Sequence, residues 1–217
     1  MENIIIIDYG VGNLRSVQKA FELVGANPVI ASEPNSIDSA SAIVLPGVGA
    51  FGDAMDKLKE RDLINPLREA ALQKKIPLLG ICLGMQLLFE HSEEGGSISG
   101  LNILPGKVVR FELEGKKDYL GAPLRLPHIG WNSVTVKTNS RLLANVSSGS
   151  DFYFVHSYHI SNADKKHMAA KSHYGADFIC AVEFENVMAT QFHPEKSQRE
   201  GQRVIANFAA ICSNGNR

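Results

Sequence analysis

The chain has 217 residues, a formal net charge of −1 and three cysteines. The balanced charge excludes the basic field that nucleic-acid binding requires, and the apolar runs are too short to span a membrane. Three widely spaced cysteines do not form a disulfide framework and are typical of the reducing cytoplasm. No secretory leader is expected, and the length suits a single domain over residues 1–217.

The first half of the chain alternates strand-like and helix-like segments. Short β-branched runs predict strands at 3–8, 27–32, 41–46 and 76–81. Apolar residues at helical spacing predict helices at 13–25, at 52–75 with a division at Pro66, and at 85–92. This order predicts an α/β fold with a parallel sheet and helices on both of its faces.

From about residue 93 the pattern changes to short strand-like runs separated by turn residues. These runs cover 107–113, 131–137, 151–160, 167–174, 179–186 and 187–194, and a last helix is expected over 197–213. Within 151–160, His156 and His159 are three residues apart, so an extended strand would place them on opposite faces. That arrangement, together with the lack of zinc-type cysteine spacing, argues against a metal site.

The stretch "LPGVGAFGDAM" (45–55) contains the pattern G-x-G-x-x-G at 47–52. A dinucleotide fingerprint belongs at the first strand-to-helix turn, but this match follows the third predicted strand. The first such turn, "DYGVGNLRS" (8–16), has Arg15 where the third Gly or Ala is needed. The glycines are therefore interpreted as giving the backbone freedom to turn.

The stretch "PLLGICLGMQLLFE" (77–90) places Cys82 between a buried strand and a helix, within the pattern Gly80-x-Cys82-x-Gly84. This is the cysteine form of the nucleophile elbow, in which flanking glycines allow a tight turn. The helix amino terminus favours a thiolate, and the Leu83 N–H can donate to an oxyanion. The alternative is a buried structural cysteine, which is the interpretation for Cys180 and Cys212.

A nucleophilic thiolate needs a base and a group that orients the base. The segment "ATQFHPEKSQ" (189–198) offers His193 and Glu195, which would face the same way in an extended strand. Glu195 could then hold His193 while the imidazole addresses Cys82. A surface His–Glu pair is the alternative, and the sequence alone does not bring residues 82 and 193 together.

The whole chain resembles the class I glutamine amidotransferases, which share G-x-C-x-G and H-P-E. Three motifs resemble more specifically the glutaminase subunits of imidazole glycerol phosphate synthases: "DYGVGNLRS", "PHIGWN" (127–132) and "FVHSYH" (154–159). Segment 112–125 has no clear family pattern and is expected to be a variable loop. The resemblance implies a flavodoxin-like three-layer sandwich, with a mostly parallel central sheet and a β-rich C-terminal half.

The resemblance also implies hydrolysis of L-glutamine to L-glutamate and ammonia through a thioester on Cys82, with His193 as proton shuttle and Glu195 as its orienter. It places Val48 beside Leu83 as a second oxyanion donor. The residues that it implies for glutamine binding are Gly49, Gln86, Glu94, Ser157 and Tyr158. No cofactor or metal is implied.

The ammonia is expected to pass to a (β/α)₈-barrel cyclase subunit in a cytoplasmic heterodimer of histidine biosynthesis, with Lys196 and Gln198 at the interface. The products there would be imidazole glycerol phosphate and aminoimidazole carboxamide ribotide, and the cyclase would activate the glutaminase allosterically. Three alternatives stay open. They are the glutaminase subunit of anthranilate synthase or aminodeoxychorismate synthase, a cysteine peptidase of related fold, and a non-catalytic nucleotide-binding module.

Overall fold

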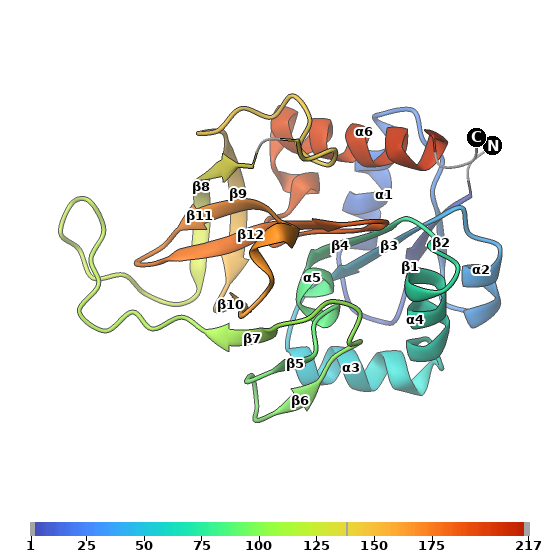
Figure 1. The fold of residues 1–217 in the computed structure, drawn as a ribbon, viewed down its shortest axis with the longest axis horizontal. Helices are drawn as coiled ribbons and strands as arrows, with labels where there is room; N and C mark the ends of the chain where they lie inside the picture. Colours follow the sequence, from blue (N-terminus) through green and yellow to red (C-terminus); the bar gives the residue numbers. More distant parts are fainter. Residues whose placement is uncertain (1–2, 138, 215–217) are drawn as a thin grey trace.

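The computed structural model describes residues 3–137 and 139–214. A parallel block of strands forms one side of the sheet, in the order β2-β1-β3-β4-β13, and β1 to β4 are labelled in Figure 1. Its strands are β1 (Ile4–Ile7), β2 (Val29–Ala31), β3 (Ala42–Gly47), β4 (Leu78–Cys82) and β13 (Val187–Thr190). The short β-branched runs of the sequence thus form the predicted strands, of which β1, β3 and β4 are buried, whereas the edge strand β2 is partly exposed.

The sheet continues beyond β13 into a region where most strand pairs are antiparallel. These strands are β5 (His91–Ser92), β6 (Ile98–Ser99), β7 (Lys107–Arg110), β8 (His128–Val136), β9 (Asp151–His156), β10 (Tyr158–Ser161), β11 (Met168–His173) and β12 (Asp177–Phe184). The path runs β13-β12-β10-β7-β5-β6, while β11 links β12 to β8 and β8 pairs with β9. The second half is therefore β-rich, as expected.

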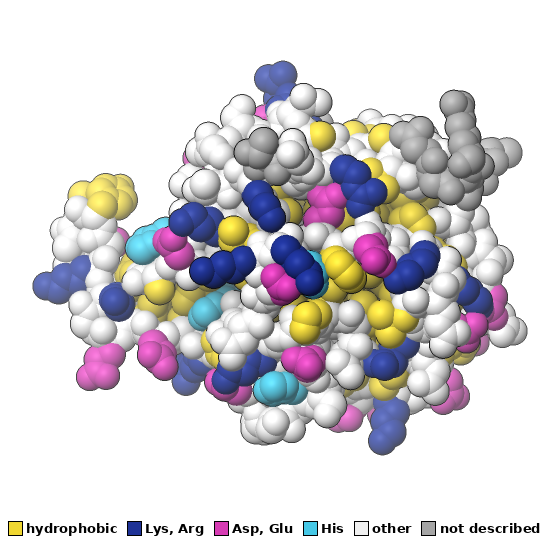
Figure 2. Space-filling view, in the orientation of Figure 1, with side chains coloured by type: hydrophobic (Ala, Val, Ile, Leu, Met, Phe, Trp, Pro, Cys, Tyr) yellow, Lys and Arg dark blue, Asp and Glu magenta, His cyan; other side chains and the backbone are white. Residues whose placement is uncertain are grey.

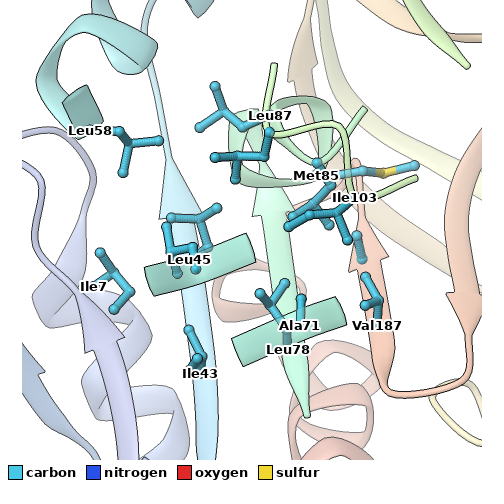
Figure 3. Close-up of a cluster of buried hydrophobic side chains, with 14 of the residues drawn as sticks. Ile7, Ile43, Leu45, Leu58, Ala71, Leu78, Met85, Leu87, Ile103 and Val187 are labelled. Carbon is cyan, nitrogen blue, oxygen red and sulfur yellow. The ribbon is translucent and has the colours of Figure 1, made fainter. Parts of the chain in front are cut away.

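Helices cover both faces of the sheet (Figure 1). They are α1 (Leu14–Glu22), α2 (Pro34–Asp38), α3 (Phe51–Glu60), α4 (Ile64–Leu72), α5 (Leu83–Leu87) and α6 (Gln198–Asn214), with short 3₁₀ helices η1 (Lys165–His167) and η2 (Pro194–Lys196). Alternate residues of β1 point to opposite faces. Ile5 and Ile7 pack with α3 to α5, whereas Ile4 and Ile6 pack with α1 and α6. Figure 3 shows Ile7 within the first of these two clusters. This arrangement confirms the three-layer α/β fold.

Two helix predictions need correction. The segment 52–75 breaks at Arg61–Leu63, where Asp62 has a φ of 54°, and not at Pro66. Pro66 lies in the first turn of α4, where backbone N–H groups have no partner within the helix, so proline costs no helical hydrogen bond there. The helix expected over 85–92 is the shorter α5, and the chain then turns into β5.

The strand expected over 151–160 is divided at Ser157 into β9 and β10. This break overturns the expectation that His156 and His159 lie on opposite faces. Both rings contact Phe111, with ring centroids 5.3 Å and 4.4 Å away. The break also directs Ser157 and Tyr158 into the pocket described below.

The loop 112–125 projects from the body of the protein (Figure 1), with apolar side chains at its tip (Figure 2). The Asp118 carboxylate accepts hydrogen bonds from the backbone N–H groups of Leu120 and Ala122, which orders the turn. Over the rest of the face in Figure 2, basic and acidic side chains are interspersed. None of the helices within the described residues is long and apolar enough to cross a membrane.

Candidate active site

Cys82 forms a strained turn between β4 and α5, with a φ of 55° and a ψ of −109°. A positive φ is costly for a residue with a side chain and is characteristic of functional sites. The flanking glycines make the turn possible. A Cβ on Gly84 would overlap the Leu45 carbonyl oxygen of β3, and a Cβ on Gly80 would lie 2.8 Å from the Gly84 oxygen. The elbow predicted from the sequence is confirmed.

The strand order brings the cysteine and the histidine together. β4 lies between β3 and β13 and is parallel to both, with Cys82 opposite Gly47 and Ile81 opposite Thr190. The chain that leaves the carboxyl end of β13 therefore passes directly beside Cys82, and His193 lies on it. This pairing joins segments more than 100 residues apart, which local sequence patterns could not reveal.

His193 and Glu195 form a buried pair, with 2.8 Å between Nδ1 and Oε1 and side chains 2% exposed. The predicted contact is correct, but Glu195 lies in the 3₁₀ turn η2, not in an extended strand. Burial lowers the pKa of His193, but its interactions with Cys82 and Glu195 outweigh that effect and raise the pKa to about 10. Its Nε2 is buried with no hydrogen-bond partner among the described residues. Because Nδ1 contacts Glu195, Nε2 is the ring nitrogen left to exchange a proton with the nearby Cys82.

A cavity of about 250 Å³ opens onto the Cys82 sulfur. It is lined by Val48, Gly49, Cys82, Leu83, Gln86, Glu94, Pro127, Val155, His156, Ser157, Tyr158 and His193. The structure thus gathers in one pocket the residues predicted for the nucleophile, base, oxyanion donors and glutamine contacts. Glu195 lies behind His193, and Lys196 and Gln198 are exposed outside the cavity.

The two residues predicted as oxyanion donors both line this cavity. Leu83 is the first residue of α5, and Val48 directly follows β3. Gly47 has no space for a side chain because a Cβ would overlap the Tyr9 hydroxyl. That hydroxyl is buried with no hydrogen-bond partner among the described residues, and burial, followed by the nearby Cys82, raises the pKa of the Tyr9 phenol above its usual range.

Glu94 has a structural contact as well as a place in the cavity wall. Its Oε2 accepts a hydrogen bond from the backbone N–H of Phe51, at 2.9 Å. Phe51 is the first residue of α3, so the carboxylate satisfies one of the free donors at the helix amino terminus. Glu94 therefore anchors the loop that carries Val48 and Gly49.

Sequence reasoning missed a set of hydrogen-bonded polar side chains around the cavity, of which Gln191 and His128 are buried. Gln191 contacts the Cys82 sulfur, and His128 links Asn132 to His156. Gln191 had a usable signal, because it precedes His193 by two positions and so shares its face of an extended strand. His128 and Asn132 lie in the motif "PHIGWN", but the motif did not reveal their contact with His156, which depends on the pairing of β8 with β9.

A larger cavity, of about 750 Å³, lies at the amino-terminal ends of the parallel strands, beside the segments that lead into β3, β4 and β13. Its three cationic side chains are already paired: Lys74 with Asp38, Lys75 with Glu185 and Arg141 with Glu183. No predicted site residue lines it, so the smaller cavity is the candidate active site. Within residues 3–137 and 139–214, no cluster of three or more His, Cys, Asp or Glu could hold a metal ion.

Comparison with known proteins identifies the family of the chain. The family glutamine amidotransferase class-I matches residues 5–212. The imidazole glycerol phosphate synthase subunit HisH of Syntrophotalea carbinolica is 48% identical, over 94% of this chain and 98% of its own. The corresponding subunit of Geobacter metallireducens is 47% identical, over 96% and 98%.

Among solved structures, a crystal structure of a glutamine amidotransferase superposes with a TM-score of 0.73 at 17% identity, over 96% of this chain and 98% of that one. This likeness supports the fold, and the closer sequence matches define the family. The chain therefore belongs to the class I glutamine amidotransferases and, within them, to the family of imidazole glycerol phosphate synthase HisH subunits.

Proposed function

We propose that this chain is a glutaminase that hydrolyses L-glutamine to L-glutamate and ammonia through a thioester on Cys82. One observation carries the proposal. The strained Cys82 elbow and the buried His193–Glu195 pair meet at a single cavity, whose other walls hold the residues expected to bind glutamine. The thiol, imidazole and carboxylate suffice for acyl transfer to water, so the reaction needs no cofactor. We assign this activity to a single domain spanning residues 1–217.

In the proposed mechanism, the Cys82 sulfur attacks the side-chain amide carbon of glutamine. His193 holds the proton from the thiol and delivers it to the departing ammonia, and it later takes a proton from the water that resolves the thioester. Glu195 accepts the Nδ1–H of His193, which orients Nε2 toward the sulfur. The raised pKa of His193 favours the imidazolium beside a thiolate.

The tetrahedral intermediates carry an oxyanion that needs two donors. Leu83 N–H supplies one. Val48 N–H supplies the other after rotation of the Gly47–Val48 peptide, which in the resting chain turns this N–H away from the site. The isolated subunit is therefore slow, and binding of the cyclase with its nucleotide substrate favours the rotated state. Because a Cβ at Gly47 would overlap the Tyr9 hydroxyl, substitution of Val48 is the cleaner test of this rotation.

The partner in this proposal is a (β/α)₈-barrel cyclase subunit that forms a heterodimer with this chain in the cytoplasm. A docking face for it comprises Ile129, Trp131, Tyr153, Lys196 and Gln198. Ile129 and Trp131 are 59% and 49% exposed, and the Lys196 ammonium lies 5.7 Å from the Tyr153 ring centroid.

The docking face adjoins the proposed proton shuttle, which supports transfer of ammonia to the partner. The Tyr153 ring lies 6.5 Å from that of His193 and 6.1 Å from that of Trp131. In the complex the cyclase covers the apolar side chains of the docking face, and ammonia released beside His193 leaves beneath them. The cyclase would consume it to make imidazole glycerol phosphate and aminoimidazole carboxamide ribotide in histidine biosynthesis.

The test is ammonia release from glutamine, measured for the chain alone and for its complex with the cyclase subunit and nucleotide substrate. We expect slow hydrolysis alone and fast hydrolysis in the loaded complex. Free glutamine should be preferred over peptide amides. The partner subunits of anthranilate synthase and aminodeoxychorismate synthase should not stimulate glutamine hydrolysis by this chain. A complex that hydrolyses peptide bonds but not glutamine would contradict the proposal.

A further inference from the structure

Gln191 lies against the proposed nucleophile although none of the roles above uses it. Its side chain is completely buried, just beyond the carboxyl end of β13. Its Nε2 is 3.7 Å from the Cys82 sulfur, within hydrogen-bond range for sulfur. Its Oε1 is 3.0 Å from Nε2 of Gln86. Gln191 therefore connects the sulfur to a residue that lines the glutamine cavity.

The surrounding oxygens fix which end of the Gln191 amide faces the sulfur. Nε2 of Gln86 lies between two acceptors, Oε1 of Gln191 and the Tyr158 carbonyl oxygen at 3.2 Å. The Tyr158 backbone oxygen can only accept, so the Gln86 atom beside it must be the nitrogen, and the Gln191 atom that receives this nitrogen must be the oxygen. With the Gln191 oxygen committed to Gln86, its NH₂ group must point at Cys82.

Two buried histidines determine which groups donate and which accept at the Tyr158 end of the same hydrogen-bond network. Nδ1 of His156 is 2.8 Å from the Tyr158 oxygen and must donate to it, so its Nε2 accepts from Nδ1 of His128 at 3.0 Å. Burial lowers the pKa of His156 to about 3 and that of His128 to about 4, so both rings are neutral near pH 7. The Tyr158 carbonyl is thus held in place to receive Gln86.

We propose that Gln191 is a further catalytic residue, whose side-chain N–H donates a hydrogen bond to the Cys82 sulfur and stabilises the thiolate relative to the thiol. The proposal rests on the glutaminase function argued above. A hydrogen bond to an anion is stronger than one to a neutral group, and the buried setting increases the difference. The stabilisation acts on the attacking thiolate and again when water attacks the thioester, its C–S bond breaks and the thiolate departs.

The informative variant is Gln191→Glu, which keeps the shape and the acceptor for Gln86 but replaces the donor with a carboxylate oxygen beside the sulfur. Gln191→Leu removes the donor without adding charge. The matched control is Thr190→Val, at the last residue of β13 and next to Gln191 in the chain. Thr190 is equally buried and donates to the Phe192 carbonyl oxygen, so this control removes a buried hydrogen bond that does not involve the sulfur.

Alkylation of Cys82 by iodoacetamide is followed by peptide mass spectrometry from pH 5 to pH 10, in the complex with the cyclase subunit, because only the thiolate reacts. We expect Gln191→Leu to move the midpoint of alkylation upward by roughly one pH unit or more, and Gln191→Glu to move it further. Both should lower kcat for glutamine by about 10- to 100-fold with a smaller change in KM. Thr190→Val should keep the wild-type midpoint.

An unchanged alkylation midpoint in folded Gln191→Glu or Gln191→Leu would overturn the role of Gln191, and melting curves establish which variants fold. If neither variant shifts the midpoint while the wild-type complex hydrolyses glutamine, the glutaminase function stands and the inference about Gln191 fails. If the wild-type complex releases no ammonia, the glutaminase function fails, while the alkylation profiles still decide the contact because they require no glutamine.

Discussion

The two halves of the sheet contribute to the site in different ways. The N-terminal parallel half shapes the backbone: the Cys82 elbow, the adjacent Gly47 and the start of α5. The C-terminal half, after β7, supplies His193, the proposed proton shuttle, and Tyr158, one of the residues proposed to bind glutamine. The pairing of β4 with β13 joins the two contributions. Substitutions that add side-chain atoms should therefore be most damaging in the first half, and substitutions that remove a charge should be most damaging in the second.

The largest effect is expected from Cys82→Ala, which removes the proposed nucleophile. We predict that glutamine hydrolysis by the complex falls by about 10⁴-fold or more, with little change in melting temperature. Added ammonium should restore cyclase turnover, because making ammonia and using it are separate steps. The control is Cys180→Ala, which removes a fully buried thiol elsewhere in the core and should lower stability while preserving most activity. Inactivation by Cys180→Ala would point to a different thiol.

Val48→Pro tests the backbone of the first half by removing the proposed second oxyanion donor. Losing one such donor costs about 100- to 1,000-fold in rate. We therefore expect this loss in the activity stimulated by the cyclase, and a much smaller change in the basal activity of the isolated chain. Val48→Ala, which keeps the N–H, is the control. If the isolated wild-type chain is already as fast as the loaded complex, peptide rotation is not the activating step.

Glu195→Gln tests the electrostatics of the second half. Removing this carboxylate should lower glutamine hydrolysis by about 100-fold, because the imidazolium loses its orienting charge. The pKa of His193 is raised from 6.5 to about 10, so this group stabilises the fold fully below pH 6.5 and loses that contribution as the pH rises through 10.

The same variant should therefore flatten the pH dependence of folding. Urea unfolding of Glu195→Gln at pH 6, 8 and 9.5 should show a smaller loss of unfolding free energy with rising pH than wild type. An equally steep loss in both proteins would show that the carboxylate does not raise the pKa of His193.

Gly84→Ala tests the packing of the first half without touching any polar group of the site. Its Cβ would overlap the Leu45 carbonyl oxygen, and this backbone atom cannot move without displacing β3. We expect a loss of about 3 kcal/mol or more in unfolding free energy. Gly115→Ala is the comparison, because its φ of 70° is strained but its Cβ would meet no atom within 4 Å. That variant should cost only about 1–2 kcal/mol, and equal costs would refute the packing argument.

The smallest effect is expected from Lys196→Ala on the docking face. Lys196 is exposed and its contact with the Tyr153 ring is worth about 0.5–1 kcal/mol. We predict a decrease of a few-fold in the cyclase products formed per glutamine hydrolysed, with an unchanged KM for glutamine. Equal ratios of hydrolysis to synthesis in the variant and the wild type would argue against a place for Lys196 at the interface.

The difference between the halves also explains what the sequence could predict. The Cys82 elbow is contained in five consecutive residues, so its glycine spacing was sufficient evidence. The contact of His193 with Glu195 was predicted correctly, but from an extended strand that is not present. The 3₁₀ turn found there also brings these two side chains together. The break at Ser157 was missed, and with it the shared face of His156 and His159, since nothing local marks the end of β9.

The most direct test of the account is to trap the covalent intermediate. The loaded complex is mixed with isotopically labelled glutamine, quenched in acid within its turnover time and mapped by peptide mass spectrometry. We predict a glutamyl thioester on the peptide that carries Cys82, present in Cys180→Ala and absent from Cys82→Ala. Label on a different residue, or rapid hydrolysis by the Cys82→Ala complex, would contradict the account.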